Sequence, residues 1–161
     1  MIRFVTANDA ENICAIYNHY IENSISTFEE DAVAVSDMQS RIGDASEDRP
    51  WFVYEVDSGL AGFAYASPWK SRCAYRFSLE TTVYLSSDHL GRGVGTALYS
   101  HLIEEIRKKN IHSLIAAIAL PNDSSIALHE KLGFEKVGQF LEVGWKFDHW
   151  IDVGYWELIY S

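Results

Sequence analysis

The sequence predicts a single α/β or α+β domain in which helices cover a mixed β-sheet. The chain has 161 residues, which is enough for one domain with a substantial core and too few for two. Its hydrophobic fraction of 48% and aromatic fraction of 14% indicate a packed globule rather than a disordered chain. Strand-like and helical periodicities alternate without a linker, repeat or low-complexity tract, so one layered domain is expected to span residues 1–161.

The first half of the chain predicts a strand, two helices and a β-hairpin. Asn8 is placed to cap the first helix, because apolar side chains recur at helical spacing up to about Tyr20. Asp57, Ser58 and Gly59 are turn residues between two apolar runs, which is typical of a hairpin. The expected elements are, in order, a strand at 1–7, a helix from Asn8 to about Tyr20, a loop at 24–31, a helix at 37–45 capped by Ser36, and the hairpin at 51–67.

The second half alternates strands and helices around a glycine-rich turn. Residues 96–110 predict an amphipathic helix with cations near its C-terminal end, where the helix dipole favours positive charge. Asn122 or Asp123 starts the following helix, and Gly133 ends it. The expected elements are, in order, a loop at 68–75, a strand at 76–85, the glycine-rich turn, a helix at 96–110, a strand at 113–120, a helix within 121–134, and closing strands at 136–147 and 151–160.

Charge and composition exclude several classes of function. The net charge of −10 argues against a nucleic-acid partner, because phosphate backbones bind basic faces. No apolar run is long enough for a membrane span, and acidic residues interrupt the N-terminal stretch where a signal peptide would be apolar. Cys14 and Cys73 form no disulfide framework, and the six histidines form no metal-ligand pattern. We therefore expect a cytoplasmic protein with reduced thiols and no metal.

The stretch HLGRGVGTAL, residues 89–98, places Gly91, Gly93 and Gly95 between a strand and a helix. This order is typical of a phosphate site, because free N–H groups and the helix dipole attract an anion and glycines let it approach the backbone. No Lys-Ser/Thr pair follows, so the stretch is not a P-loop, and its spacing is not that of the dinucleotide-binding fingerprint. A tight connection without a ligand remains the alternative.

The order of this turn and the later PNDSSIALHEKLGF segment resembles the GNAT superfamily of acyl-CoA N-acyltransferases. Five segments look like the branch that contains phosphinothricin and methionine sulfoximine or sulfone acetyltransferases: AIYNHYIENSISTFEE, AGFAYASPW, AYRFSLETTVYLS, SSIALHEKLGFEKVG and GWKFDHWIDVGYWE. The resemblance covers nearly the whole chain. It implies one GNAT-like domain over residues 1–161, with a mixed, mostly antiparallel sheet flanked by helices.

The resemblance implies acetyl-CoA as cosubstrate, with its pyrophosphate held in the glycine-rich turn. That turn usually begins with Gln or Arg, whereas here it begins with Leu90, and Arg92 is the cation that would compensate. Asn122 has a second reading as a helix cap. The expected cofactor-binding residues are Val83, Tyr84, Leu85, Gly91, Arg92, Gly93, Val94, Gly95, Thr96, Asn122 and Ser125.

Glu80 is the candidate general base, because an ammonium must lose a proton before it can attack a thioester. Strand alternation places Glu80 on one face with Thr82 and Tyr84, unless a bulge interrupts it. The alternative is a carboxylate that merely faces water. His129 stands where the family often has the tyrosine that protonates the departing thiolate, and its imidazolium could donate that proton. A plain helix-surface histidine is the alternative.

The segment PWKSRCAYR holds three cations in an acidic chain. Arg72 and Arg76 are candidates to grip an acid group, because guanidinium binds carboxylates bidentately. Ordinary surface ion pairs and plain aromatic packing are the alternatives. The expected substrate-binding residues are Phe28, Trp69, Arg72, Tyr75, Arg76 and Thr81.

These features together predict an acetyl-CoA-dependent N-acetyltransferase that acts by direct transfer on the α-amine of a small amino-acid-like compound, a detoxification activity. Acetylation of a polyamine or a protein N-terminus is a second enzymatic reading. A non-catalytic acyl-CoA-binding module is a reading of a different class. The family's members usually pair, so a homodimer is expected, with the aromatic-rich C-terminal region as its interface.

Overall fold

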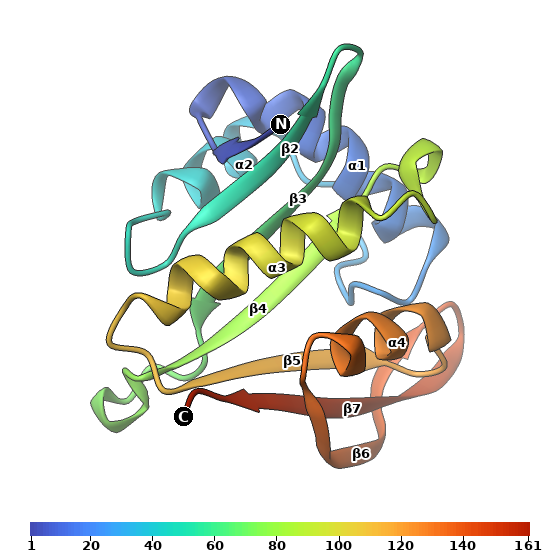
Figure 1. The fold of residues 1–161 in the computed structure, drawn as a ribbon. Helices are drawn as coiled ribbons and strands as arrows, with labels where there is room; N and C mark the ends of the chain where they lie inside the picture. The colour runs from blue at the N-terminus through green and yellow to red at the C-terminus, as the bar shows by residue number, and fades with distance from the viewer.

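One seven-stranded sheet forms the centre of the molecule, with helices on both faces (Figure 1). The computed structural model describes all residues, 1–161. The strand order is β1-β2-β3-β4-β5-β7-β6, and every neighbouring pair is antiparallel except β4–β5. The strands are β1 (Ile2–Phe4), β2 (Trp51–Val56), β3 (Gly59–Pro68), β4 (Ser78–Leu85), β5 (Ser113–Ala119), β6 (Glu135–Lys146) and β7 (His149–Ile159). The prediction of a mixed, mostly antiparallel sheet is confirmed.

Four α-helices cover the sheet in two layers. Helices α1 and α2 lie on one face, and α3 crosses the other face in front of β3 and β4, with α4 beside it (Figure 1). None of these helices is long and apolar enough to cross a lipid bilayer. The helices are α1 (Ala10–Asn23), α2 (Val35–Gly43), α3 (Val94–Arg107) and α4 (Asp123–Lys131), and short 3₁₀ turns occupy Ala7–Asp9, Cys73–Tyr75 and Ser87–His89.

The sequence placed several element boundaries wrongly. Asn8 does not cap α1: the Asp9 carboxylate accepts from the Thr6 N–H at 2.7 Å and pairs with Arg3 at 2.8 Å, which holds residues 7–9 in a 3₁₀ turn before the helix. Ser36 does not cap α2, which begins at Val35 after Ala34. The strand expected from residue 76 begins at Ser78, and the helix expected from residue 96 begins at Val94.

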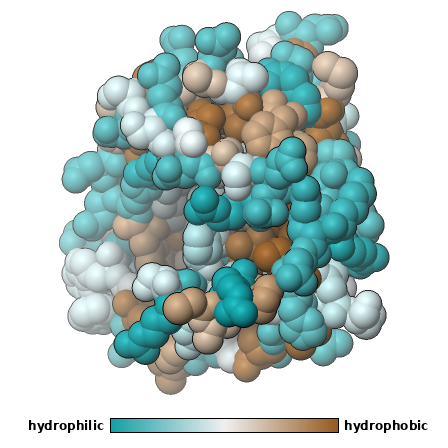
Figure 2. Space-filling model, turned by 90° about the vertical axis from the view of Figure 1, so that its left-hand side faces the viewer, coloured by the Kyte–Doolittle hydropathy of each residue, from teal (hydrophilic) through white to brown (hydrophobic).

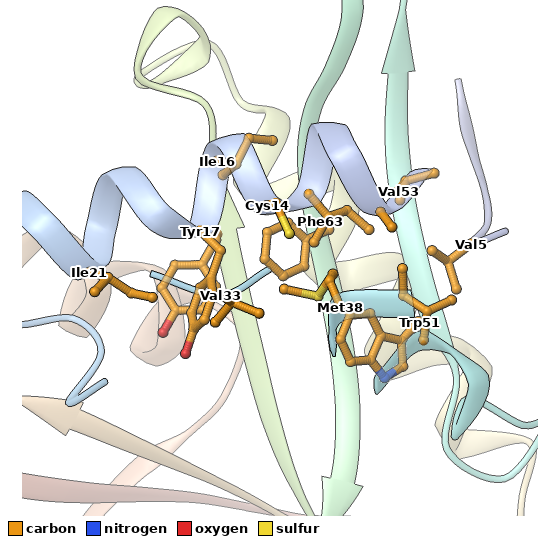
Figure 3. Packing of buried hydrophobic residues seen from close by; sticks show 14 residues of the cluster. Val5, Cys14, Ile16, Tyr17, Ile21, Val33, Met38, Trp51, Val53 and Phe63 are labelled. Atoms are coloured by element: carbon orange, nitrogen blue, oxygen red, sulfur yellow. The ribbon is translucent and has the colours of Figure 1, made fainter. Parts of the chain in front are cut away.

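Two apolar clusters hold the layers together, one on each face of the sheet. Between the sheet and helices α1 and α2, aromatic and aliphatic side chains interlock, among them Tyr17, Met38, Trp51 and Phe63 (Figure 3). The second cluster lies under α3 and reaches α4, with Leu98, Leu102 and Trp156 fully buried. Burial of this apolar surface on both faces is what fixes the sheet rigidly between the layers.

Strands β4 and β5 separate part way along their length. They pair in parallel only from Ser78 to Glu80, after which β4 continues beside β3 and β5 beside β7. Figure 1 shows the two strands diverging toward the end of the molecule where α3 begins and α4 lies. Because neither strand has a partner on this side beyond Glu80, the divergence opens the sheet at its centre.

Candidate active site

A cavity of about 660 Å³ lies where β4 and β5 diverge. Its walls come from the α1–α2 loop, the second half of β4, the glycine-rich turn, the end of β5, and α4. Strands of the sheet form one rigid side of the cavity. Two loops form other sides and contribute groups that can contact a ligand. These loops are residues 24–31, here named the acceptor loop, and residues 90–95, here named the glycine loop.

The glycine loop has the backbone geometry of an anion site. Gly91 and Gly93 have positive φ angles of 71° and 78°, which side chains rarely tolerate. Gly93 is the N-cap of α3, and no side chain caps this end, so the N–H groups of the first helical turn remain available to a ligand. Gly95 serves packing instead, because a Cβ there would lie 3.0 Å from Leu85 Cδ1.

Most of the cofactor-binding residues expected from the sequence line this cavity. Two do not: the Val94 side chain is buried in the protein, and the exposed Arg92 lies outside the lining. The phenol of Tyr84 is buried and donates to the Ser26 carbonyl at 3.1 Å, so Tyr84 supports the acceptor loop. Those that line the cavity are Val83, Tyr84, Leu85, Gly91, Gly93, Gly95, Thr96, Asn122 and Ser125.

Asn122 caps α4 with its side-chain oxygen. The Oδ1 atom accepts from the Ser125 N–H at 3.2 Å and from the Ser124 hydroxyl at 3.1 Å. The helix cap expected from the sequence is therefore present. The amide NH₂ of Asn122 donates no hydrogen bond within the protein, and the residue lines the cavity. Asn122 can consequently cap the helix and offer a donor to a ligand at the same time.

Glu80 lies in the last residue pair before β4 and β5 separate. β4 keeps an uninterrupted register with β3, so no bulge disturbs the alternation of its side chains. Glu80 lines the cavity, and burial raises the pKa of its carboxyl above the ordinary value, whereas the positive charge of Lys70 lowers that pKa. A half-buried carboxylate at this position can accept a proton from a group bound in the cavity.

His129 belongs to a buried hydrogen-bonded chain rather than to the surface of α4. Its Nδ1 lies 2.7 Å from the Ser125 carbonyl, and because a carbonyl only accepts, Nδ1 carries the proton. Its Nε2 then accepts from the Tyr99 hydroxyl at 3.1 Å, and that hydroxyl lies 2.6 Å from Thr81 Oγ1. Burial lowers the pKa of His129, although its bond to Ser125 opposes this.

This environment excludes one reading of His129 and disfavours the other. A plain surface histidine is wrong, because His129 is only 4% exposed. The imidazolium form expected to protonate the thiolate is disfavoured, because burial lowers the pKa of His129. Thr81 lines the cavity, but its hydroxyl is engaged with Tyr99 on the α3 side of the sheet. The His129–Tyr99–Thr81 chain ties α4 and α3 to β4.

The acceptor loop is held in place by side chains from distant parts of the chain. Lys146 on β6 is 2% exposed, and its ammonium donates to the carbonyls of Ser24 and Thr27, each at 2.8 Å. Burial lowers the pKa of Lys146. Gly144 lets β6 approach the loop closely, since a Cβ there would lie 2.3 Å from the Phe28 ring. Phe28 lines the cavity, as the sequence predicts.

Four of the substrate-binding residues expected from the sequence, Trp69, Arg72, Tyr75 and Arg76, do not line the cavity. Arg72, Tyr75 and Arg76 are exposed on the β3–β4 connection. The Arg76 guanidinium donates to the Cys73 carbonyl at 3.0 Å and lies 4.3 Å from the Phe77 ring centre. Trp69 packs against Tyr155. The cation whose charge acts on Glu80 is Lys70, from the same connection.

The sequence missed Lys146, Tyr99 and Tyr17 as residues of the site. Tyr17 on α1 bonds to the Thr27 hydroxyl at 2.9 Å and to the Glu29 carboxylate, so it too holds the acceptor loop. A lysine in an otherwise apolar strand end was the one available signal for Lys146. Tyr99 and Tyr17 lie on the apolar faces of helices, where the pattern indicates only packing.

The chain matches a protein-family model over almost its whole length. Residues 2–154 match the model described as acetyltransferase (GNAT) domain. A phosphinothricin N-acetyltransferase of Streptomyces viridochromogenes is 40% identical over 156 residues, which is 97% of this chain and 85% of that protein. A methionine sulfoximine/methionine sulfone acetyltransferase of Pseudomonas aeruginosa is 34% identical over 159 residues, covering 98% of this chain and 92% of that protein.

Solved structures agree with these relatives. A phosphinothricin acetyltransferase of Sinorhizobium meliloti in complex with acetyl-CoA superposes with a TM-score of 0.94 at 33% identity, covering 99% of this chain and 87% of that one. A ribosomal-protein-alanine N-acetyltransferase of Brucella melitensis gives a TM-score of 0.96 at 35% identity, with 99% of each chain covered. The chain therefore belongs to the GNAT family of N-acetyltransferases and, within it, resembles the phosphinothricin and methionine sulfoximine acetyltransferases.

Proposed function

We propose that this protein acts in the cytoplasm and transfers the acetyl group of acetyl-CoA directly to the α-amine of a small amino-acid-like acceptor, with Glu80 as the general base. The observation that carries the proposal is the position of Glu80. Its half-buried carboxylate lies where β4 and β5 part, in one cavity with the free N–H groups of α3 and with the acceptor loop. A base, an anion site and an acceptor wall thus share one space.

The residues present fit the cosubstrate at its phosphate end. The glycine loop offers free backbone N–H groups and a helix dipole, and the Asn122 amide offers a further donor. Acetyl-CoA supplies the acetyl group as a thioester. A neutral amine forms the new C–N bond with the acetyl carbon, and the C–S bond breaks. The nitrogen loses a proton as the amide forms and the departing sulfur gains one, so coenzyme A leaves as a thiol.

Glu80 makes the amine nucleophilic by taking its proton. The carboxylate form is required for this step, and burial raises the pKa of Glu80 so that the carboxylate holds a proton more strongly than an exposed one. The Lys70 charge limits that rise in pKa and so favours the ionised carboxylate. His129 and Tyr99 orient α4 and β4 around the reacting groups through their shared hydrogen bond.

The acceptor is a compound like those named for the relatives, phosphinothricin or methionine sulfoximine. Phe28 provides the apolar wall. The long side chain of Arg72, exposed on the β3–β4 connection, binds the α-carboxylate, and Arg76 supports it. A protein N-terminus is the second candidate acceptor, favoured by the structural likeness to a ribosomal-protein-alanine N-acetyltransferase.

We also propose that two copies of the chain pair through the β6–β7 hairpin. The exposed side chains of this hairpin are unusually apolar for a surface in contact with water, which is typical of an interaction site. The exposed apolar side chains are Val137, Phe140, Leu141, Val143, Trp145, Phe147 and Trp150.

A screen of coenzyme A release tests the function. Wild type and Glu80→Gln are compared on free amino acids, sulfoximines, phosphinates, polyamines and an N-terminal peptide, and acetyl-CoA binding is measured by calorimetry. We expect release with the amino-acid-like acceptors in the wild type and its loss in Glu80→Gln, with equal acetyl-CoA affinity. Release confined to polyamines or to the peptide would move the proposal to those acceptors. Binding without release for any amine would indicate a non-catalytic module.

A further inference from the structure

A second cavity, of about 310 Å³, adjoins the large one on the same face of the sheet as Glu80. The two cavities share Tyr17 and Tyr65 as walls. The second cavity has an aromatic floor, in which the Trp51 and Tyr65 rings stack with centres 4.1 Å apart. Figure 3 shows Trp51, Met38 and Phe63 facing one another at this place, between α1, α2 and the sheet. Such a floor suits an aliphatic chain rather than water.

Ser67 connects the second cavity with Glu80, because it lines that cavity together with Arg49 and pairs with Glu80. Trp51 pairs with Tyr65, and the Ala66 N–H donates to the Pro50 carbonyl at 3.1 Å. These contacts hold the segment that carries Arg49 beside β3, on the side away from β4. Arg49 and Glu80 therefore lie on opposite sides of β3.

Arg49 is the cation in this cavity that has no acidic partner. The other, Arg41, is neutralised by Glu29, whose two oxygens accept from its guanidinium at 2.6 and 2.9 Å. Arg49 is half-buried, and its guanidinium forms no ion pair and no hydrogen bond. Asp44 also lines the cavity but is exposed and lies beyond ion-pair distance of Arg49.

The backbone of Arg49 is nevertheless fixed. It forms a closed turn with Ser46, in which the Arg49 N–H donates to the Ser46 carbonyl at 3.2 Å and the Ser46 N–H donates to the Arg49 carbonyl at 3.1 Å. Figure 2 shows the side of the molecule that carries this turn, where apolar side chains are recessed between hydrophilic ones. A fixed backbone, a free guanidinium and a recessed apolar floor together form a site for a chain with an anionic end.

We propose that Arg49 binds the polar end of the acceptor's side chain while the acceptor's α-amine lies at Glu80. This inference rests on the proposed function, because it takes the α-amine to lie at Glu80. The chain then crosses Ser67 and Tyr65, and its polar end meets Arg49. Arg72 binds the α-carboxylate, so the two arginines bind opposite ends of the acceptor.

The test compares two acceptors that share the α-amine and α-carboxylate and differ at the side-chain end. Phosphinothricin carries a phosphinate there, and norleucine carries a methyl group. In Arg49→Gln we expect KM for phosphinothricin to rise roughly 10–100-fold, as loss of a charge-assisted bidentate contact implies, with KM for norleucine and for acetyl-CoA within about twofold of wild type. In Arg72→Ala, KM should rise for both amino acids.

Two further variants keep the test decisive. Arg107→Gln, which removes an exposed arginine at the far end of α3, should leave both KM values unchanged. Arg49→Lys keeps the charge and loses the planar fork, so a smaller rise for phosphinothricin alone is expected even if Arg49→Gln folds poorly. Equal effects on both acceptors, or none, would overturn the inference. Failure of the wild type to acetylate either acceptor would instead overturn the proposed function.

Discussion

The glycine loop and the acceptor loop face each other across one cavity, yet they are built by different means. The glycine loop is one continuous stretch whose shape comes from its own backbone, with positive φ angles at Gly91 and Gly93. The acceptor loop is shaped by side chains from far away, including Lys146, which is 122 residues from Ser24 and 119 from Thr27. A backbone site of the first kind accepts any phosphate-bearing cosubstrate, whereas a side-chain wall of the second kind can be altered one residue at a time. The predictions below test this division of roles.

The largest effect is expected from Glu80→Gln, because Glu80 lies in the cavity that the glycine loop and the acceptor loop share. The amide keeps the shape of the carboxylate and cannot accept the proton, so kcat should fall roughly 10²–10⁴-fold, the usual range for loss of a general base. Acetyl-CoA affinity measured by calorimetry should not change. Near-normal turnover of Glu80→Gln between about pH 6 and 9 would show that Glu80 is not the general base.

Gly93→Val should disrupt the glycine loop and leave the acceptor loop unchanged. The positive φ of 78° costs a side chain about 1–2 kcal/mol, and a branched one more, so the turn must reshape and its N–H groups lose their common direction. We expect acetyl-CoA affinity to fall at least about tenfold by calorimetry. Gly138→Val is the matched control, because Gly138 lies on β6 with open space around it and no positive φ. Unchanged affinity in a folded Gly93→Val protein would contradict a phosphate role for the turn.

Lys146→Met should loosen the acceptor loop and leave the glycine loop unchanged. Two carbonyls lose a charged donor, each such bond being worth about 1.5–3 kcal/mol, and the acceptor loop is freed from β6. We expect KM for the acceptor to rise roughly tenfold while KM for acetyl-CoA stays the same, with a lower melting temperature. Lys136→Met, on the exposed end of the same strand, is the control. An equal rise in both KM values would show that Lys146 stabilises the whole fold rather than this loop.

The same contrast explains how much could be predicted from the sequence. The glycine spacing, the Asn122 cap and the alternation around Glu80 are local patterns, and the structure reproduces each of them. The shape of the acceptor loop could not be predicted in this way, because no local pattern in residues 24–31 indicates that a lysine from β6 binds there. The arginines chosen from the sequence, Arg72 and Arg76, are conspicuous by composition, whereas Arg49 is identified only by the cavity that it lines together with Ser67, the partner of Glu80.

The start of the first helix was predicted wrongly for a related reason, because a contact that is not evident from the local pattern determines it. Asn8 has the right residue type for a cap, but the Arg3–Asp9 ion pair, which joins β1 to the turn before α1, determines where the helix begins. For His129 the sequence predicts an acid for the departing thiolate, with a surface position on α4 as the alternative, and only the position of Tyr99 on α3 shows that His129 is buried in a hydrogen-bonded chain.

A smaller effect is expected at Asn122, where substitutions can separate the helix-capping role of Oδ1 from the ligand-binding role of the NH₂ group. Asn122→Ala should lower stability by about 1 kcal/mol through loss of the cap, measured by denaturant unfolding. Asn122→Asp keeps the capping oxygen and loses the NH₂ donor. It should therefore keep its stability and still bind acetyl-CoA more weakly, as Asn122→Ala does. Wild-type affinity in Asn122→Asp at low and high salt would restrict Asn122 to capping.

The smallest effect concerns Lys70, which acts on Glu80 through charge alone. Glu80 works as a carboxylate, so kcat/KM falls as the pH drops through its pKa. The Lys70 charge stabilises the carboxylate and lowers that pKa. In Lys70→Met the pKa rises, and the acid limb of the pH profile of kcat/KM should move to higher pH, with no change on the plateau above it. Because Lys70 is exposed, the shift will be modest and screened by salt. Raising the ionic strength should therefore move the wild-type limb toward that of the variant and leave the variant's limb almost in place. A limb that does not move in Lys70→Met, or that responds equally to salt in both proteins, would mean that Glu80 does not set the acid limb.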